Sequence, residues 1–113
     1  MIDRLAVIAK FGGKCAYCGD LISVKGMHVD HHVAKERAHQ HPEIDVNGID
    51  NLFPACASCN LWKSVNSIEQ FRRQIEDQLN QLKSYSQYKL ALRYGLIEER
   101  PHKVVFHFER WEK

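Results

Sequence analysis

The sequence predicts one small α+β domain held together by a metal ion, on three observations. The chain has 113 residues, enough for a single modest hydrophobic core. Two Cys-x-x-Cys pairs stand far apart, with strand-like segments between them. After the second pair, apolar residues recur at spacings of three and four, which is typical of helices. We therefore expect one domain over residues 1–113, with a core at about 11–66 and an extension over 67–113.

Composition and charge favour an ordinary soluble protein of the cytoplasm. The chain is 44% hydrophobic and 27% charged, with a formal net charge of +2. That charge permits nucleic-acid binding only if the basic side chains cluster. No apolar stretch is long enough to span a membrane, and the start MIDRLAVIAKFGG does not match a secretory signal. We therefore expect a cytoplasmic protein without membrane contact, whose thiols stay reduced.

The cysteine pairs predict a structural zinc site. Cys15 and Cys18 form the first knuckle, and Cys56 and Cys59 form the second. Two disulfides or four ordinary buried thiols are the alternatives, but two regular pairs in a chain without a secretory signal favour zinc. Four thiolates surround Zn²⁺ tetrahedrally and leave no open position. We therefore expect this zinc to stabilise the fold and to take no part in chemistry.

The segment between the knuckles predicts a β-hairpin followed by a loop. Leu21–Val24 is expected to form the first strand, Lys25-Gly26 the turn and Met27–Val33 the return strand. The polar stretch after it, with Pro42 and an Asn-Gly pair, predicts a loop with one helical turn at Ala34–His39. A helix is then expected to open at the second knuckle.

The return strand carries the cluster HVDHH at residues 28–32, which predicts a second, catalytic metal site. If zinc joins the knuckles, Asp30 and His31 can approach Asn60, the residue directly after Cys59. Carboxylate and amide oxygens suit a hard cation such as Mg²⁺ or Mn²⁺. Neutral His31 beside such an ion is a candidate general base. Lys63, on the same helical face as Asn60, is a candidate contact for a DNA phosphate.

Taken together, these pieces resemble the HNH, or ββα-metal, endonuclease family. The matching stretches are CAYC, VDHHVA, DNLFPACASCN and NLWK, within about residues 11–64. The resemblance implies a zinc-stapled ββα-metal (His-Me finger) core of the zinc-bearing branch. It also implies a phosphodiester hydrolase that acts on DNA.

The resemblance also implies a role for each matching residue. Asp30 and Asn60 correspond to the ligands of the catalytic ion, and His31 to the general base that activates water. Asn51 corresponds to the asparagine that ties the loop to the strand and orients the base. The four cysteines correspond to the ligands of the structural zinc.

Two positions depart from the family pattern. His32 stands where the family usually has an aliphatic residue, so His32 is an alternative candidate for the base. Ala34 replaces a common proline. In a regular strand, moreover, Asp30 and His31 point to opposite faces, so the strand must end or twist there for both to share a site.

The predicted function is a metal-dependent DNA endonuclease with structural Zn²⁺ and catalytic Mg²⁺ or Mn²⁺. One alternative is a non-catalytic zinc module that binds nucleic acid or protein and needs only the knuckles. Another is a regulatory subunit that acts only inside a larger nuclease or packaging complex. The expected partners are DNA and either a second copy of the chain or such a complex.

The C-terminal third predicts a helical extension and a terminal strand. Ser67 and Gln70 fit a capping box that opens an amphipathic helix reaching Leu82. A second helix is expected over Ser86–Tyr94, ending at Gly95. The alternation in VVFHFERW, from residue 104 onward, predicts a strand. These elements are expected to cover the zinc core, with a dimer face or a DNA-positioning surface as alternatives.

Overall fold

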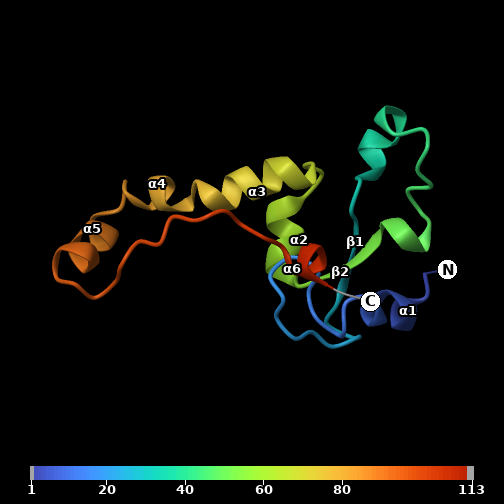
Figure 1. The fold of residues 1–113 in the computed structure, drawn as a ribbon, viewed down its shortest axis with the longest axis horizontal. Helices are drawn as coiled ribbons and strands as arrows, with labels where there is room; N and C mark the ends of the chain where they lie inside the picture. The colour runs from blue at the N-terminus through green and yellow to red at the C-terminus, as the bar shows by residue number, and fades with distance from the viewer. Residues whose placement is uncertain (1, 112–113) are drawn as a thin grey trace. The chain divides into compact units, whose positions relative to one another are not determined.

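The computed structural model describes residues 2–111, which form two compact units. One unit contains the chain up to residue 68 together with the segment from residue 105 onward, and the other contains residues 69–104. Helices and a small sheet occur together, which confirms the predicted α+β class (Figure 1). Within residues 2–111, no helix combines the length and the apolar character needed to cross a bilayer.

A two-stranded antiparallel sheet lies at the centre of the first unit. It pairs β1 (His28–His31) with β2 (Leu52–Ala55), side by side in Figure 1. The register places Asp30 opposite Phe53 and His31 opposite Leu52. All four residues of β2 are buried, as its apolar sequence LFPA requires.

The predicted hairpin between Leu21–Val24 and the return strand is wrong. Leu21 forms only an isolated bridge with Lys14, inside the first knuckle, and its side chain is 80% exposed. The strand pairs instead with the segment that follows the long loop. All four side chains of LFPA are buried in this pairing, so the apolar face of the strand lies in the core.

Two short helices hold the sheet in place. Helix α1 (Arg4–Ala9) begins at the N-cap Asp3 and contacts β2, and its buried Val7 packs with Met27 and Leu52. Helix α2 (Ala57–Lys63) opens at the second knuckle, as predicted, and contacts β1. It ends where Ser64 takes a positive φ of 49°. The sheet and α2 thus form the expected ββα unit.

The loop between the strands contains two 3₁₀ turns. The first, η1 (Lys35–Gln40), matches the predicted helical turn, and the second, η2 (Ile49–Asn51), leads directly into β2. The ammonium group of Lys10 donates to the carbonyls of Ile49 at 2.7 Å and Leu52 at 2.8 Å. Helix α1 is thereby tied to the entry of β2.

The predicted terminal strand is also wrong, because this segment packs on the first knuckle as a helical turn. Helix α6 (His107–Arg110) begins where the Glu109 carboxylate accepts from the Phe106 N–H at 2.9 Å. The N–H groups of His107 and Phe108 donate to the carbonyls of Tyr17 and Ala16. Because these N–H donors bond to the knuckle, they do not pair with a strand.

An aromatic cluster fills the space between this segment and the sheet. Phe106 is 2% exposed and lies edge-on to the Tyr17 ring, with 5.7 Å between centroids. Phe108 lies edge-on to Phe53 at 5.1 Å. The last residues of the described chain therefore complete the core of the first unit.

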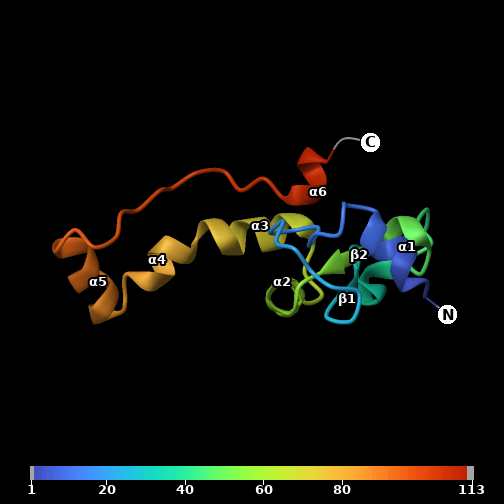
Figure 2. The same ribbon diagram turned by 90° about the horizontal axis from the view of Figure 1, so that it is seen from below.

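The second unit is built from three helices and an extended return segment (Figure 2). They are α3 (Ile68–Glu76), α4 (Gln78–Leu82) and α5 (Ser86–Arg93). The single predicted helix reaching Leu82 is thus interrupted at Asp77, whereas α5 ends near Gly95 (φ 74°) as expected. Arg72 in α3 donates to the carbonyl of Val104 at 2.6 Å, which joins the first helix of this unit to its return segment.

Candidate metal centre and active site

The two knuckles bring all four cysteines into one cluster. The Sγ atoms of Cys15, Cys18, Cys56 and Cys59 lie within 4.8 Å of one another. Cys18 Sγ and Cys56 Sγ are 3.9 Å apart. A tetrahedral site with Zn–S bonds of about 2.3 Å has sulfur–sulfur edges of about 3.8 Å. The donor set and its dimensions therefore fit zinc, as the spacing predicted.

The thiols influence one another strongly at this distance. A hydrogen bond from the Cys59 thiol lowers the pKa of Cys15 to about 4. Burial, together with the negative charge of Cys15, raises the pKa of Cys18 to about 12. Placing several thiolates this close requires a cation among them, and a divalent ion meets that requirement.

The second predicted cluster lines one open cavity of about 280 Å³. Asp30 and His31 reach it from β1, and Asn60 reaches it from α2. The remaining lining residues come from β1, from the segment after it and from the two positions after α2: Val29, Ala34, Lys35, Glu36, Ser64 and Val65. The structure thus brings together the three residues expected to share a site. Their chemistry is a carboxylate, an amide and an imidazole.

Asp30 is nearly buried, and two donors hold the same oxygen of its carboxylate. The Tyr17 hydroxyl donates to Oδ2 at 2.5 Å, and the Lys63 ammonium lies 3.0 Å from that atom. Burial and the nearby carboxylate raise the pKa of Tyr17, so the phenol keeps its proton. The buried carboxylate therefore has both a cation and a neutral donor beside it.

The structure gives Lys63 a role other than the predicted phosphate contact. Its side chain is fully buried, and besides Asp30 its ammonium group donates to the carbonyl of His31 at 3.3 Å. An ammonium group enclosed in this way cannot reach a phosphate on the surface. Lys63 instead fixes α2 to β1 through Asp30.

We expect the Lys63→Met substitution to lower the free energy of unfolding by about 3–5 kcal/mol, because it leaves the Asp30 carboxylate buried without its cation. Urea denaturation of the zinc-loaded protein measures this change. The matched control is Lys89→Met, because Lys89 is exposed on α5. A loss below about 1 kcal/mol, similar to that of the control, would show that the ion pair is unimportant.

The two adjacent histidines occupy different surroundings. His31 Nε2 lies 3.1 Å from Asn47 Oδ1. His32 instead stacks on Phe53, with ring centroids 4.2 Å apart, and its Nδ1 lies 3.2 Å from the Tyr17 hydroxyl. Burial and the charges of Lys63 and Lys10 lower the pKa of His32 to about 4. His32 also lines a different cavity, of about 510 Å³, away from Asn60.

Asn51 joins the long loop to the strand by three hydrogen bonds of its buried amide. Its Oδ1 accepts from the Val33 N–H at 2.8 Å, and its Nδ2 donates to the carbonyls of Val33 at 3.0 Å and Val46 at 2.9 Å. These bonds hold the exit of β1, directly after the two histidines.

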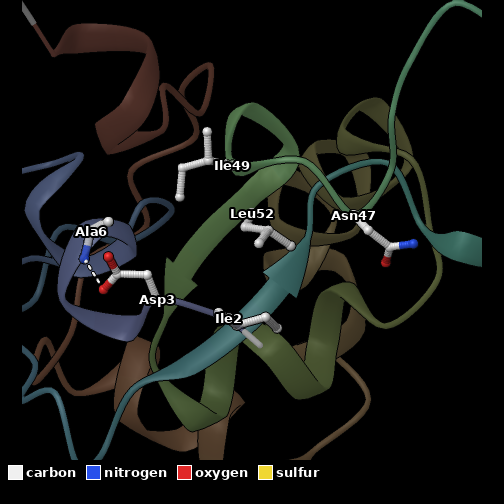
Figure 3. A pocket seen from close by; sticks show the side chains of 6 residues that line it. All are labelled: Ile2, Asp3, Ala6, Asn47, Ile49 and Leu52. Atoms are coloured by element: carbon white, nitrogen blue, oxygen red, sulfur yellow. Dashed lines mark hydrogen bonds between the residues drawn. The ribbon is translucent and has the colours of Figure 1, made fainter.

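A further cavity, of about 470 Å³, lies beside α1 (Figure 3). Ile49 and Leu52 give it apolar walls, and Asp3 accepts from the Ala6 N–H at 3.1 Å. Asn47, which contacts His31, also lines this cavity. Asp3 is the one carboxylate in this lining and already caps α1, so these lining residues do not suggest a further metal site.

Sequence reasoning missed two residues of the site. Tyr17 lies between the two ligands of the first knuckle, and Asn47 belongs to the Asn-Gly pair of the predicted loop; the motifs give neither residue a role in the site. Tyr17 has a hydroxyl and Asn47 has a side-chain amide, and neither group is needed to space zinc ligands or to form a turn. The usable signal for Tyr17 was its aromatic ring between two zinc ligands, because a tyrosine that becomes buried needs a partner for its hydroxyl. No local signal pointed to the contact between Asn47 and His31.

Comparison with known families supports the resemblance found in the sequence. Residues 15–65 match the family model described as HNH endonuclease. The matched segment includes both knuckles, β1, β2 and α2, and the clustered cysteines fit the zinc-bearing branch. Searches of curated proteins and of solved structures find no match.

Proposed function

We propose that this chain, whose residues 15–65 match the HNH endonuclease family model, is a metal-dependent endonuclease that hydrolyses DNA phosphodiester bonds. The observation that carries the proposal is the single cavity lined by Asp30, His31 and Asn60. The knuckle cysteines alone would serve any zinc module. A hydrolase also needs groups that bind a catalytic ion and activate water. A carboxylate, an amide and an imidazole around one opening can supply these functions.

Two ions with different ligands divide the work in this proposal. Zn²⁺ on the four cysteines joins the knuckles and thereby holds α2 against the sheet. Asp30 and Asn60 would hold Mg²⁺ or Mn²⁺ through their side-chain oxygens. The hard ion, when bound, stabilises negative charge on the phosphate and on the departing oxygen. A four-thiolate site is also compatible with a reducing compartment such as the cytoplasm.

His31 acts as the general base, and its contact with Asn47 supports that role. The amide oxygen of Asn47 only accepts, so His31 Nε2 carries the proton of the neutral ring. Nδ1 then has the free lone pair that takes a proton from the attacking water. Asn51 holds the backbone just beyond this histidine. We prefer His31 to His32 as the base, because His32 is packed within the aromatic cluster.

Nicking of supercoiled plasmid tests the proposal. We expect the zinc-loaded protein to nick only when Mg²⁺ or Mn²⁺ is added, and we expect Asn60→Ala to lose most of this activity. The matched control is Asn80→Ala, on the exposed surface of α4, which should nick like wild type. Equal nicking by the Asn60→Ala protein would contradict the assignment. DNA binding without any cleavage would favour the non-catalytic zinc module.

A further inference from the structure

We propose that Tyr17 is a positioning residue for Asp30, and that it links the zinc cluster to the site of the catalytic ion. The inference rests on the proposed function, because Asp30 is the residue assigned to that ion. Tyr17 lies between two zinc ligands, Cys15 and Cys18, and is 2% exposed. Its hydroxyl donates to Asp30 Oδ2 at 2.5 Å.

Asp30 is held from both knuckles at once. Tyr17 belongs to the first knuckle, and Lys63 lies one helical turn beyond Cys59 of the second knuckle. Both residues contact the same carboxylate oxygen, at 2.5 Å and 3.0 Å. Because the cysteine cluster joins the two knuckles, it also fixes the distance between these two donors. The position of the carboxylate is therefore set by the zinc cluster.

The surroundings of Tyr17 leave its ring little freedom. Its carbonyl accepts from the His107 N–H at 3.0 Å, and its ring lies edge-on to Phe106 and to Phe108. His32 lies close to the hydroxyl on the other side, at 3.2 Å from Nδ1. A phenol held in this way presents its hydroxyl in one place, so it can orient the carboxylate that it contacts.

The contacts also distinguish the two oxygens of Asp30. Tyr17 and Lys63 both occupy Oδ2, which leaves Oδ1 for a further ligand. Without the Tyr17 hydroxyl, Lys63 would be the remaining donor to Oδ2. The Asp30 carboxylate could then rotate about its Cβ–Cγ bond. We therefore expect the hydroxyl to increase affinity for the catalytic ion without affecting zinc.

Manganese binding by the full-length, zinc-loaded protein tests this inference in the absence of DNA. Electron paramagnetic resonance measures free Mn²⁺ during a titration of wild type, Tyr17→Phe and Tyr94→Phe. Tyr94 is the matched control because it is 74% exposed on the second unit. We expect Tyr17→Phe to weaken Mn²⁺ binding by about 10–100-fold with zinc content unchanged, and Tyr94→Phe to bind like wild type.

Each outcome has a defined meaning. A Tyr17→Phe protein that keeps its zinc and binds Mn²⁺ within about twofold of wild type would overturn the inference while leaving the proposed function intact. A wild-type protein with no saturable Mn²⁺ site would overturn both. If Tyr17→Phe fails to fold, a fluorotyrosine placed only at position 17 serves instead. It keeps the shape of the tyrosine side chain and changes the strength of its hydroxyl as a hydrogen-bond donor. An unchanged Mn²⁺ affinity in that protein would equally overturn the inference.

Discussion

Replacing Cys59 with alanine is expected to unfold the first compact unit, the largest effect that we predict for any single substitution. Zinc-finger peptides gain roughly 10–16 kcal/mol from their metal, more than a small core can supply by itself. Three remaining sulfurs would bind zinc more weakly, and the knuckles would separate. Near-ultraviolet circular dichroism and thermal melting, with zinc content measured in parallel, follow this loss.

The control for Cys59→Ala is Ser58→Ala, at the exposed neighbouring position in α2. We expect that protein to keep both its zinc and its melting transition. A cooperative, native-like melt of the Cys59→Ala protein would contradict the claim that zinc stabilises this fold. Stoichiometric zinc in an unfolded Cys59→Ala protein would contradict the coupling between metal binding and folding.

Replacing His31 with alanine is expected to lower the rate of plasmid nicking by about 10²–10⁴-fold, the usual contribution of a general base. The fold and the zinc content should survive, because the structure gives the ring one hydrogen bond, to Asn47, at the edge of the unit. A His39→Ala protein provides the control, since His39 is exposed on η1. Cleavage by His31→Ala at the wild-type rate would remove His31 from the mechanism.

Features of this fold that depend on local signals could be predicted from the sequence. The four cysteines gather as their spacing indicated, and α2 opens at the second knuckle. Gly95, shortly after the end of α5, takes a positive φ, which glycine adopts readily because it has no Cβ atom. Each knuckle and each helix end depends on a few neighbouring residues, and the two knuckles come together because their thiols share one metal chemistry.

The pairing of strands depends on contacts between segments that are far apart in the sequence. A local sequence pattern could therefore not predict it. Leu21–Val24 lies nearer to β1 in sequence, but the strand pairs with Leu52–Ala55 across the long loop. The alternating segment after Val104 resembles a strand by its pattern. Its N–H groups instead bond to carbonyls of the first knuckle. In both cases the deciding partner lies outside the window that a pattern covers.

The positions of several candidate site residues can be compared with the expectation from sequence, whereas their roles stay predictions. Asp30, His31 and Asn60 line one cavity as the sequence led us to expect, although their chemical roles remain predictions. Lys63 was placed on the correct helix, but its direction depends on the position of Asp30 in the folded chain. Tyr17 could not be assigned to Asp30 from sequence, because only the joined knuckles bring them together.

Anomalous diffraction from crystals of the zinc-loaded protein soaked in MnCl₂ tests the two-ion account most directly. Data on both sides of the zinc and manganese absorption edges locate each metal separately. The account predicts a zinc peak among the four cysteine sulfurs and a manganese peak between Asp30 and Asn60. A manganese ion found only elsewhere, or zinc bound by the Asp30 site with the cysteines empty, would contradict it.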